Sequence, residues 1–506
     1  MFKLPGMVHA LTSTLLTLSV STASPPPAPE PRPLPEVSHF ERTPCNDEVA
    51  KDERIDCGVL VVPENRSKAG TRMIRLPVMI FRSRAEKPAA EPLLFMPGGP
   101  GVSAVDNQRS GKSLSILDER DFIFLEPRGG KHSRPSLECP EVNALTAEVA
   151  AGRLRGQKFV EAMVSAARNC RATLTASGVD LDGYTTDATA HDIEDLRKAL
   201  GYAKWNLYGL SYSTRLMLAV MRLHPAGIQS VILDSVFPPD VVFDEFGSTN
   251  LLRALNVVFD GCAADRACGT AYPRLRAQFA QLVSSADARP IRLGLDAAAT
   301  GERPVEVRGA QVADAIYLGL HRRDTIPLLP RIISQAATGQ PEELAALVKD
   351  NQGASRMTWG LRMSVTCAEE NPFENGARVA AQLSPAMGLG GIDERTVPTE
   401  VCRVWNVASA PAGVKEPVRS DIPTLIYAGE FDPDTPPEWG QQLLETLPHA
   451  VFVELRGFSH GASFNPCGRE ITKAFLRDPT STLPTACALK LRGADFSLSA
   501  QPGQNP

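Results

Sequence analysis

The sequence lacks the patterns that mark several protein classes. Its ten cysteines form no C-x-x-C pair and no histidine lies at zinc-ligand spacing from them, so we expect no structural metal. No run of like charges is long enough for an interaction tail and the net charge is only −5, which argues against nucleic acid as a partner. We also find no internal repeat. What remains, 506 residues with 43% hydrophobic and 22% charged side chains, is an ordinary globular composition.

The N-terminus is typical of an exported protein. Lys3 precedes an apolar and hydroxylic stretch at 7–20, and small residues follow at 21–23, so we predict a signal peptide over 1–23. The apolar stretch is too short to anchor the chain in a membrane, and we expect no integral membrane segment after cleavage. Seven prolines make 24–39 a linker that cannot pack, and folded structure should begin near Phe40.

Disulfides fit the even number of cysteines in an exported chain. Loop-closure entropy favours pairing between near neighbours, so we predict that the cysteines pair in their order along the chain. The predicted pairs are Cys45–Cys57, Cys139–Cys170, Cys262–Cys268, Cys367–Cys402 and Cys467–Cys487.

The hydrophobic pattern predicts an α/β protein with a mostly parallel, doubly wound sheet. Two β-rich runs over 57–82 suggest an antiparallel start of the sheet, and short apolar runs of the kind buried on both faces follow at 93–96, 122–125, 205–208, 231–233, 424–427 and 451–455. Helical patterns lie between them, including 188–200, on which we place Asp192 outward.

Residues 241–405 break this alternation and are mainly helical. We therefore divide the mature chain into four parts. They are a first core part (40–240), a cap insertion (241–405), a C-terminal core part (406–492) and a flexible tail (493–506).

The strongest local motif is GLSYS at 209–213, which lies between an apolar strand and a helix. A nucleophile elbow needs this context because its sharp turn exposes the serine hydroxyl above the sheet, so Ser211 is the predicted nucleophile. Serine needs an adjacent base. His460, in a loop after a strand, is a better candidate than His449, which precedes that strand at the opposite end of the sheet.

The acid that orients the base should lie between serine and histidine in the sequence. Asp432 starts a turn after an apolar strand, and we predict that it orients His460. The alternative is Asp434, which with Thr435 looks like the N-terminal cap of the next helix.

The oxyanion hole requires two backbone N–H donors. One is expected from Tyr212, which follows the nucleophile, and the other from the loop MPGGPG at 96–101, with Gly99 the predicted donor.

Six motifs occur in the order PGGPG, FLEPRGG, YTT with Asp192, GLSYS, GEFDPDTPP and GFSHG. Together they resemble the tripeptidyl aminopeptidase-like branch of the α/β-hydrolases, relatives of prolyl aminopeptidase, over about residues 45–487. The resemblance implies an α/β-hydrolase fold with an inserted helical cap, and the same roles for Ser211, Asp432, His460 and Gly99. The chain departs from the family pattern at Ser213 in place of glycine, at Glu126 in place of aspartate, and at 130–133.

An exopeptidase must bind the α-ammonium of its substrate, which an acidic side chain in a pocket does best. The segment TCAEEN at 366–371 resembles the family's Cys-x-acid element, so Glu369, followed by Glu370, is the candidate amine-binding residue. If Glu369 is structural, other cap acids such as Asp244 or Glu245 take its place.

These features predict an exported aminopeptidase that releases residues or short peptides through an acyl-enzyme, acting as a monomer without cofactor or metal. A carboxylesterase with the same triad is the alternative, because this fold supports many chemistries. A catalytically silent binding protein is a third possibility, which labelling with a fluorophosphonate probe would test.

Overall fold

The computed structural model describes residues 37–45, 54–107, 115–150, 153–293, 305–350, 357–384, 389 and 397–500. The predicted signal peptide and most of the proline-rich linker lie outside the described residues. The first strand, β1 (His39–Thr43), begins close to the predicted start of folded structure.

Within the described residues, nine strands form one sheet in the order β1-β2-β3-β5-β4-β6-β7-β10-β11. After β1, the strands are β2 (Ile55–Pro63), β3 (Met73–Phe81), β4 (Leu93–Met96), β5 (Phe122–Leu125), β6 (Trp205–Leu210), β7 (Ile228–Asp234), β10 (Thr424–Gly429) and β11 (Ala450–Leu455). The first strands pair antiparallel, and all pairs from β5 to β11 are parallel. This arrangement confirms the predicted α/β architecture with an antiparallel start.

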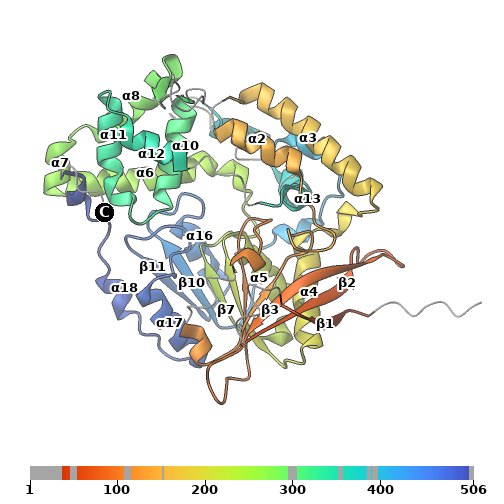
Figure 1. Cartoon of the computed structure of the whole chain (residues 1–506). Coiled ribbons are helices and arrows are strands. Elements are labelled where there is room, and N and C mark those ends of the chain that lie inside the picture. The colour runs from red at the N-terminus through yellow and green to blue at the C-terminus, as the bar shows by residue number, and fades with distance from the viewer. Residues whose placement is uncertain are drawn as a thin grey trace, which may run out of the picture. The chain divides into compact units, whose positions relative to one another are not determined.

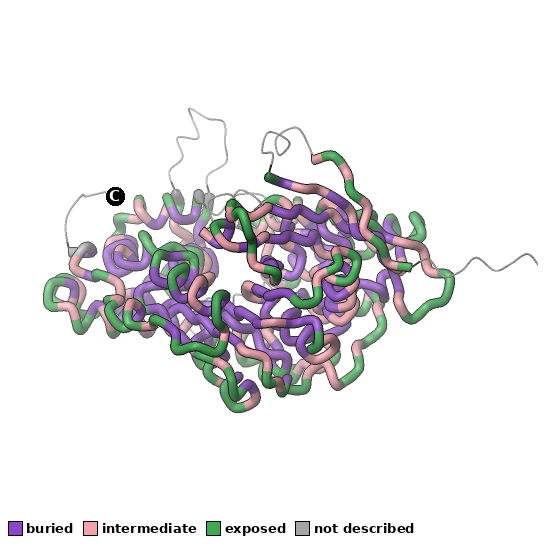
Figure 2. Tube along the Cα trace, turned by 90° about the horizontal axis from the view of Figure 1, so that it is seen from below, coloured by how far each residue is buried: buried purple, intermediate pink, exposed green. Residues whose placement is uncertain are grey.

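Helices cover both faces of the sheet. On one face, α4 (Thr186–Ala199) and α5 (Tyr212–Leu223) contribute Ile193, Leu196, Leu216 and other apolar side chains to a core shared with the strands. On the other face, α17 (Pro466–Arg477) and α18 (Ala486–Lys490) pack against the aromatic side chains of β4 and β5. The central strands are therefore buried along their length, as Figure 2 shows.

Between β7 and β10 the described chain is mainly helical, with one small hairpin. Its helices are α6 (Gly247–Ala264), α7 (Arg266–Ala271), α8 (Leu275–Ala288), α10 (Gly309–Leu320), α11 (Leu329–Ala337), α12 (Glu342–Asp350), α13 (Trp359–Glu369), α14 (Gly376–Gln382) and α15 (Thr399–Trp405), and its strands are β8 (Ile291–Leu293) and β9 (Val305–Val307). Helices α6 to α12 share a core of their own and lie together in Figure 1. The boundaries 241 and 405 of the cap stay a prediction.

Two helices before the elbow, α2 (Pro140–Ala150) and α3 (Gly156–Ala176), were missed by the sequence analysis. They share a core with α13 and α15 that includes Trp359 and Trp405. These two helices, from the first core part of the sequence, therefore pack with the predicted insertion.

The outward placement of Asp192 is wrong. Its side chain is fully buried and accepts hydrogen bonds from Arg128 (Nε 2.8 Å) and Arg66 (2.6 Å). Helical periodicity alone placed it on the polar face, but the arginine of the motif FLEPRGG, also fully buried, requires a carboxylate partner inside the fold.

Part of the predicted flexible tail has regular structure. Residues 496–500 form a 3-10 helix, and the buried ring of Phe496 packs beside Phe431 with 6.2 Å between centroids. The ring lies where a side chain at Gly261 of α6 would be, which is why this end of the chain can pack on the helical region.

The structure joins all ten cysteines in the predicted order, with Cα–Cα distances from 5.1 to 5.7 Å. The pair Cys367–Cys402 ties the end of α13 to α15, and Cys467–Cys487 ties α17 to α18. Among the described residues, no helix is both long and apolar enough to cross a membrane.

Candidate active site

Ser211 lies at the sharp turn between β6 and α5. Its φ of 58° falls in the left-handed region, which a non-glycine residue adopts only where the surrounding structure enforces it. A Cβ at Gly209 would lie 2.2 Å from the backbone oxygen of Ser213, so only glycine lets strand and helix approach this closely. The sequence therefore forms a strained turn that presents the hydroxyl of Ser211 at the end of the strand.

Ser213 stands where the related pattern has glycine, and it has a contact of its own. Its buried hydroxyl donates a short hydrogen bond to the backbone oxygen of Pro97. The substitution thus links the first turn of α5 to the glycine loop after β4.

This glycine loop lies directly against the serine. A Cβ at Gly98 would lie 2.7 Å from the Cβ of Ser211, and Gly99 has a φ of 119° that favours glycine. The loop is held from the other side by Arg362 of α13, which donates to the backbone oxygen of Gly99 (3.2 Å). The predicted oxyanion donors, Gly99 and Tyr212, therefore flank Ser211, one in a loop and one at the start of a helix.

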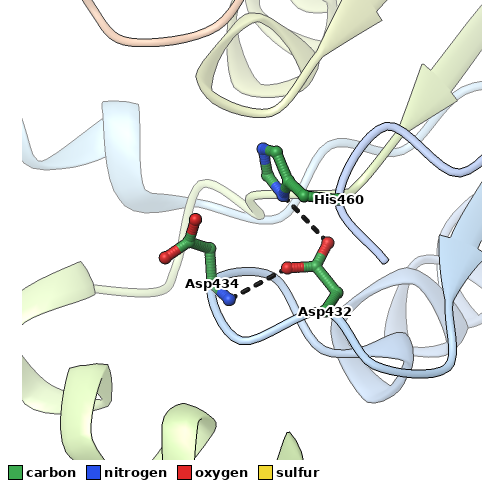
Figure 3. Close-up of side chains that lie close together, drawn as sticks. All are labelled: Asp432, Asp434 and His460. Atoms are coloured by element: carbon green, nitrogen blue, oxygen red, sulfur yellow. Dashed lines mark hydrogen bonds and ion pairs between the residues drawn. The ribbon is translucent and has the colours of Figure 1, made fainter. Parts of the chain in front are cut away.

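His460 and Asp432 meet at the ends of β10 and β11. His460 Nδ1 donates to Asp432 Oδ2 at 2.9 Å (Figure 3), so Nε2 is left to accept a proton. The other oxygen of Asp432 accepts from the backbone N–H groups of Asp434 and Thr435, each at 2.9 Å. The hydroxyl of Thr435 completes the set by donating to Asp432 Oδ2 (2.7 Å).

Charges around His460 make it a strong base. Burial alone would lower the pKa of His460, but the charge and hydrogen bond of Asp432, together with the charges of Asp434 and Asp234, raise it to about 9. Burial opposes the charged form of Asp432 as well, and the His460 charge still holds the pKa of Asp432 below its ordinary value. Below about pH 9 the pair is therefore an imidazolium beside an ionised Asp432, and loss of the proton on Nε2 turns the ring into the base.

A second buried aspartate fixes the loop that carries His460. Asp234, the last residue of β7, accepts hydrogen bonds from the backbone of Ala462 (3.1 Å) and Ser463 (3.0 Å), and Ser235 accepts from Gly461 (2.8 Å). Ser235 adopts a φ of 61° to do so. Neither residue was predicted from the sequence, although an aspartate that ends an apolar strand on the catalytic edge is a usable signal.

Asp434 does not cap the next helix as predicted. Helix α16 (Pro437–Gln442) begins after Pro436, and the carboxylate of Asp434 instead binds Tyr317 of α10 and His321, the residue that follows this helix. Prolines at 436 and 437 shift the helix start beyond the reach of this side chain. One ligand atom each from Asp432, Asp434 and His460 lie within 4.8 Å of one another, a spacing that could hold a cation, but these side chains already take part in hydrogen bonds.

Two cavities meet at Ser211. One, of about 570 Å³, lies under the helical region and is lined by Gly99, Tyr212, Asp244, Glu370 and Asp434 among others. The other, of about 540 Å³, is lined by His460 and by aromatic side chains such as Phe95 and Phe464. Ser211 and Gly99 line both, so a bound substrate can extend to either side of the serine hydroxyl.

Glu369 is not among the residues that line these cavities. Its buried carboxylate accepts from the backbone N–H (2.6 Å) and hydroxyl (2.5 Å) of Thr186, and burial raises its pKa to about 7 against these hydrogen bonds. Thr186 belongs to the YTT motif, and the hydroxyl of Thr186 also forms a hydrogen bond with the hydroxyl of Tyr212 (2.7 Å). The geometry thus gives Glu369 a structural position behind the oxyanion residue.

Glu370 does line the first cavity, but its charge is compensated. Its carboxylate pairs with Arg215 and with Lys415 (2.9 Å), and it also accepts from the backbone of Phe243 (3.0 Å). Glu245 likewise bonds Arg378 and the backbone of Asn375. Neither acid is placed as an uncompensated negative charge.

Asp244 is the remaining acid of this group. It lines the first cavity, and among the described residues no hydrogen bond or ion pair to its carboxylate is found. Burial, and then the neighbouring charge of Glu374, raise its pKa to about 7, while Arg362 acts in the opposite direction. A cation entering this cavity would favour the charged form of Asp244.

Comparison with known families agrees with this geometry. A family model described as alpha/beta hydrolase fold matches residues 91–282, which include the glycine loop and the elbow, and a model described as TAP-like protein matches residues 392–487, which include Asp432 and His460.

Several relatives match most or part of the chain. Serine protease Hip1 of Mycobacterium tuberculosis is 25% identical over 479 residues, covering 86% of this chain and 88% of that protein. Carboxylesterase B of the same species is 26% identical, covering 86% and 87%. Tripeptidyl aminopeptidase of Streptomyces lividans is 31% identical over 195 residues, covering 37% and 36%.

Solved structures of hydrolases are similar at low identity. The proline iminopeptidase of Mycobacterium smegmatis is 14% identical, with 83% of this chain and 98% of that chain covered and a TM-score of 0.39.

Proposed function

We propose that this serine hydrolase with an α/β-hydrolase fold, whose C-terminal part matches the TAP-like family model, is an exported aminopeptidase that releases residues or short peptides from substrate N-termini. The observation that carries the proposal is the pairing of Asp432 with His460 beside an elbow serine, next to a cavity lined by Asp244, whose carboxylate has no hydrogen bond or ion pair among the described residues. Five disulfides support export, because such bonds persist in oxidising compartments.

In the proposed mechanism Ser211 attacks the scissile carbonyl and His460 Nε2 accepts its proton. Asp432 keeps the proton of His460 on Nδ1 and stabilises the imidazolium that forms. The backbone N–H groups of Gly99 and Tyr212 would bind the oxygen that becomes negative. His460 then protonates the leaving amine, and water hydrolyses the acyl-enzyme with the same base.

The two cavities suggest how a peptide lies. His460 must reach the leaving amine, so the cavity lined by His460 takes the C-terminal part of the substrate. The other cavity then takes the N-terminal part, where Asp244 would bind the α-ammonium. In this proposal the role assigned to Glu369 passes to Asp244.

The test compares free-amine peptide chromogens, the same peptides with acetylated N-termini, and a neutral p-nitrophenyl ester. Asp244→Asn should lower kcat/KM for free-amine peptides by roughly 30-fold or more, since losing one partner of such a pair costs about 2–5 kcal/mol. On acetylated peptides and on the ester, neither of which carries a free ammonium, the Asp244→Asn variant should have the same kcat/KM as the wild type. Equal effects on all three substrates would remove the amine-binding role from Asp244.

A carboxylesterase is the second candidate, because Carboxylesterase B matches the chain over the same length as the serine protease. In that case the wild-type protein would hydrolyse the ester and no free-amine peptide. That result would overturn the aminopeptidase proposal and leave the assignment of serine, acid and base in place.

A further inference from the structure

Asp434 places a second carboxylate beside the base. One of its oxygens lies within 4.8 Å of a ligand atom of Asp432 and of His460, yet Figure 3 shows its side chain turned away from the Asp432–His460 hydrogen bond. Two carboxylates so close to one imidazole could both bind it. Other contacts must therefore hold Asp434 in place, so that only Asp432 binds His460.

The C-terminal end of α10 and His321, the residue that follows it, supply partners for both oxygens of Asp434. The hydroxyl of Tyr317 donates to Oδ1 at 2.6 Å, and Nε2 of His321 donates to Oδ2 at 3.0 Å. The backbone of the same loop is held by α6, where Asn250 donates to the carbonyl of Asp434 (2.8 Å). Two helices of the predicted cap thus fix both the position and the direction of this carboxylate.

The hydrogen bonds of His321 determine its charge. Its Nδ1 lies 2.9 Å from the backbone oxygen of Tyr317, and its Nε2 lies 3.0 Å from the carboxylate of Asp434. Both partners are acceptors, so both ring nitrogens must carry hydrogen for these bonds to form together. If both hydrogen bonds form, the ring is an imidazolium that pairs with the negative carboxylate of Asp434.

The imidazolium also stands next to the base. The rings of His321 and His460 meet edge to face with 5.7 Å between centroids. We propose that Tyr317 and His321 are positioning residues that bind and neutralise Asp434, so that Asp432 alone orients His460. This inference rests on the proposed triad, and it makes the cap a part of the catalytic apparatus rather than only a wall of the binding cavity.

Several charged groups act on this site. Asp432, Asp434 and Asp234 raise the pKa of His460, and His321 holds the pKa of Asp434 well below its usual range against the effect of burial. Burial lowers the pKa of Arg362 of α13, whereas the nearby charges of Asp244 and Asp434 act to raise it. In the intact site the positive His321 offsets the negative Asp434.

The proposal predicts a specific pattern in a double-mutant cycle. His321→Leu should leave the charge of Asp434 uncompensated and free to compete for His460. The acid limb of the pH profile of kcat/KM should then shift to higher pH by about one unit, the size expected when one charge acts on His460 from a few ångströms away. Asp434→Asn should move the limb downward, and adding it to His321→Leu should restore most of the activity. Tyr317→Phe should give a smaller change in the same direction as His321→Leu.

The experiment uses the full-length, disulfide-bonded protein and a neutral p-nitrophenyl ester, so amine recognition does not enter. Fluorophosphonate labelling normalises the rates to active protein, and His191→Gln serves as the control. His191 is a half-buried histidine of α4 that hydrogen-bonds His224, the residue that follows α5 (2.8 Å). This control should match the wild type in rate and in pH profile.

Two results would overturn the proposal. One is a double variant no more active than His321→Leu alone, which would mean that His321 only docks the helix. The other is an acid limb that stays in place in His321→Leu. Loss of both ester turnover and labelling in the wild type is a different result, because it would remove the proposed triad itself.

Discussion

Replacing Asp432 with asparagine changes the acid by one atom, and the surrounding hydrogen bonds determine which way the new amide faces. Asp432 Oδ1 accepts from two buried backbone N–H groups, and Oδ2 accepts from Thr435 and His460. If the amide nitrogen faced the backbone, both N–H groups would lose their acceptor, at about 1–3 kcal/mol each. The amide nitrogen of Asp432→Asn should therefore face His460.

This orientation gives His460 the wrong tautomer. An amide N–H donates to Nδ1, so the ring proton must sit on Nε2, which then cannot accept a proton from Ser211. We expect kcat to fall on the order of 10⁴-fold, which corresponds to about 5.5 kcal/mol in activation free energy. Folding should persist, because asparagine keeps the volume of the side chain and its contacts with the backbone.

The assay measures kcat on a neutral ester after active-site labelling, with thermal unfolding and disulfide mass mapping to check the fold. Asp240→Asn is the control, because Asp240 is exposed and bonds only Gln442 in the structure's described part. This variant should keep the wild-type rate. A kcat for Asp432→Asn within tenfold of wild type would refute the reasoning and transfer the orienting role to another acid.

Three further outcomes are expected. Ser211→Ala should abolish turnover and fluorophosphonate labelling while leaving the fold intact, since loss of a triad nucleophile costs on the order of 10⁶ in kcat. Activity within tenfold of wild type would show that Ser211 is not the nucleophile. Because His460 acts as a base only when deprotonated and its pKa is raised to about 9, kcat/KM for an ester should climb with pH through about 9, and a plateau already reached at pH 7 would contradict this. Gly98→Ala should lower kcat by about 10²–10³-fold, because the new Cβ would lie 2.7 Å from the Cβ of Ser211 and displace the oxyanion loop. The control Gly413→Ala should keep the wild-type kcat, because a Cβ at that position meets nothing within 4 Å.

The sequence determined the features that depend on neighbouring residues. Apolar runs located the strands of the parallel sheet, and the context of Ser211 between strand and helix located the elbow, because both signals lie within about a dozen residues. The order of the cysteines also predicted their pairing, since short loops cost the least entropy to close.

Only the tertiary structure decided what each buried acid faces. Glu369 meets Thr186 across 183 residues of sequence, Asp434 meets Tyr317 across 117, and Asp234 meets Ser463 across 229. A local pattern shows that a residue is acidic and whether it follows a strand or a helix. Whether the residue then binds a backbone, a helix of the cap or a substrate depends on how distant elements pack, because burying a carboxylate is tolerated only where those elements bring donors to it.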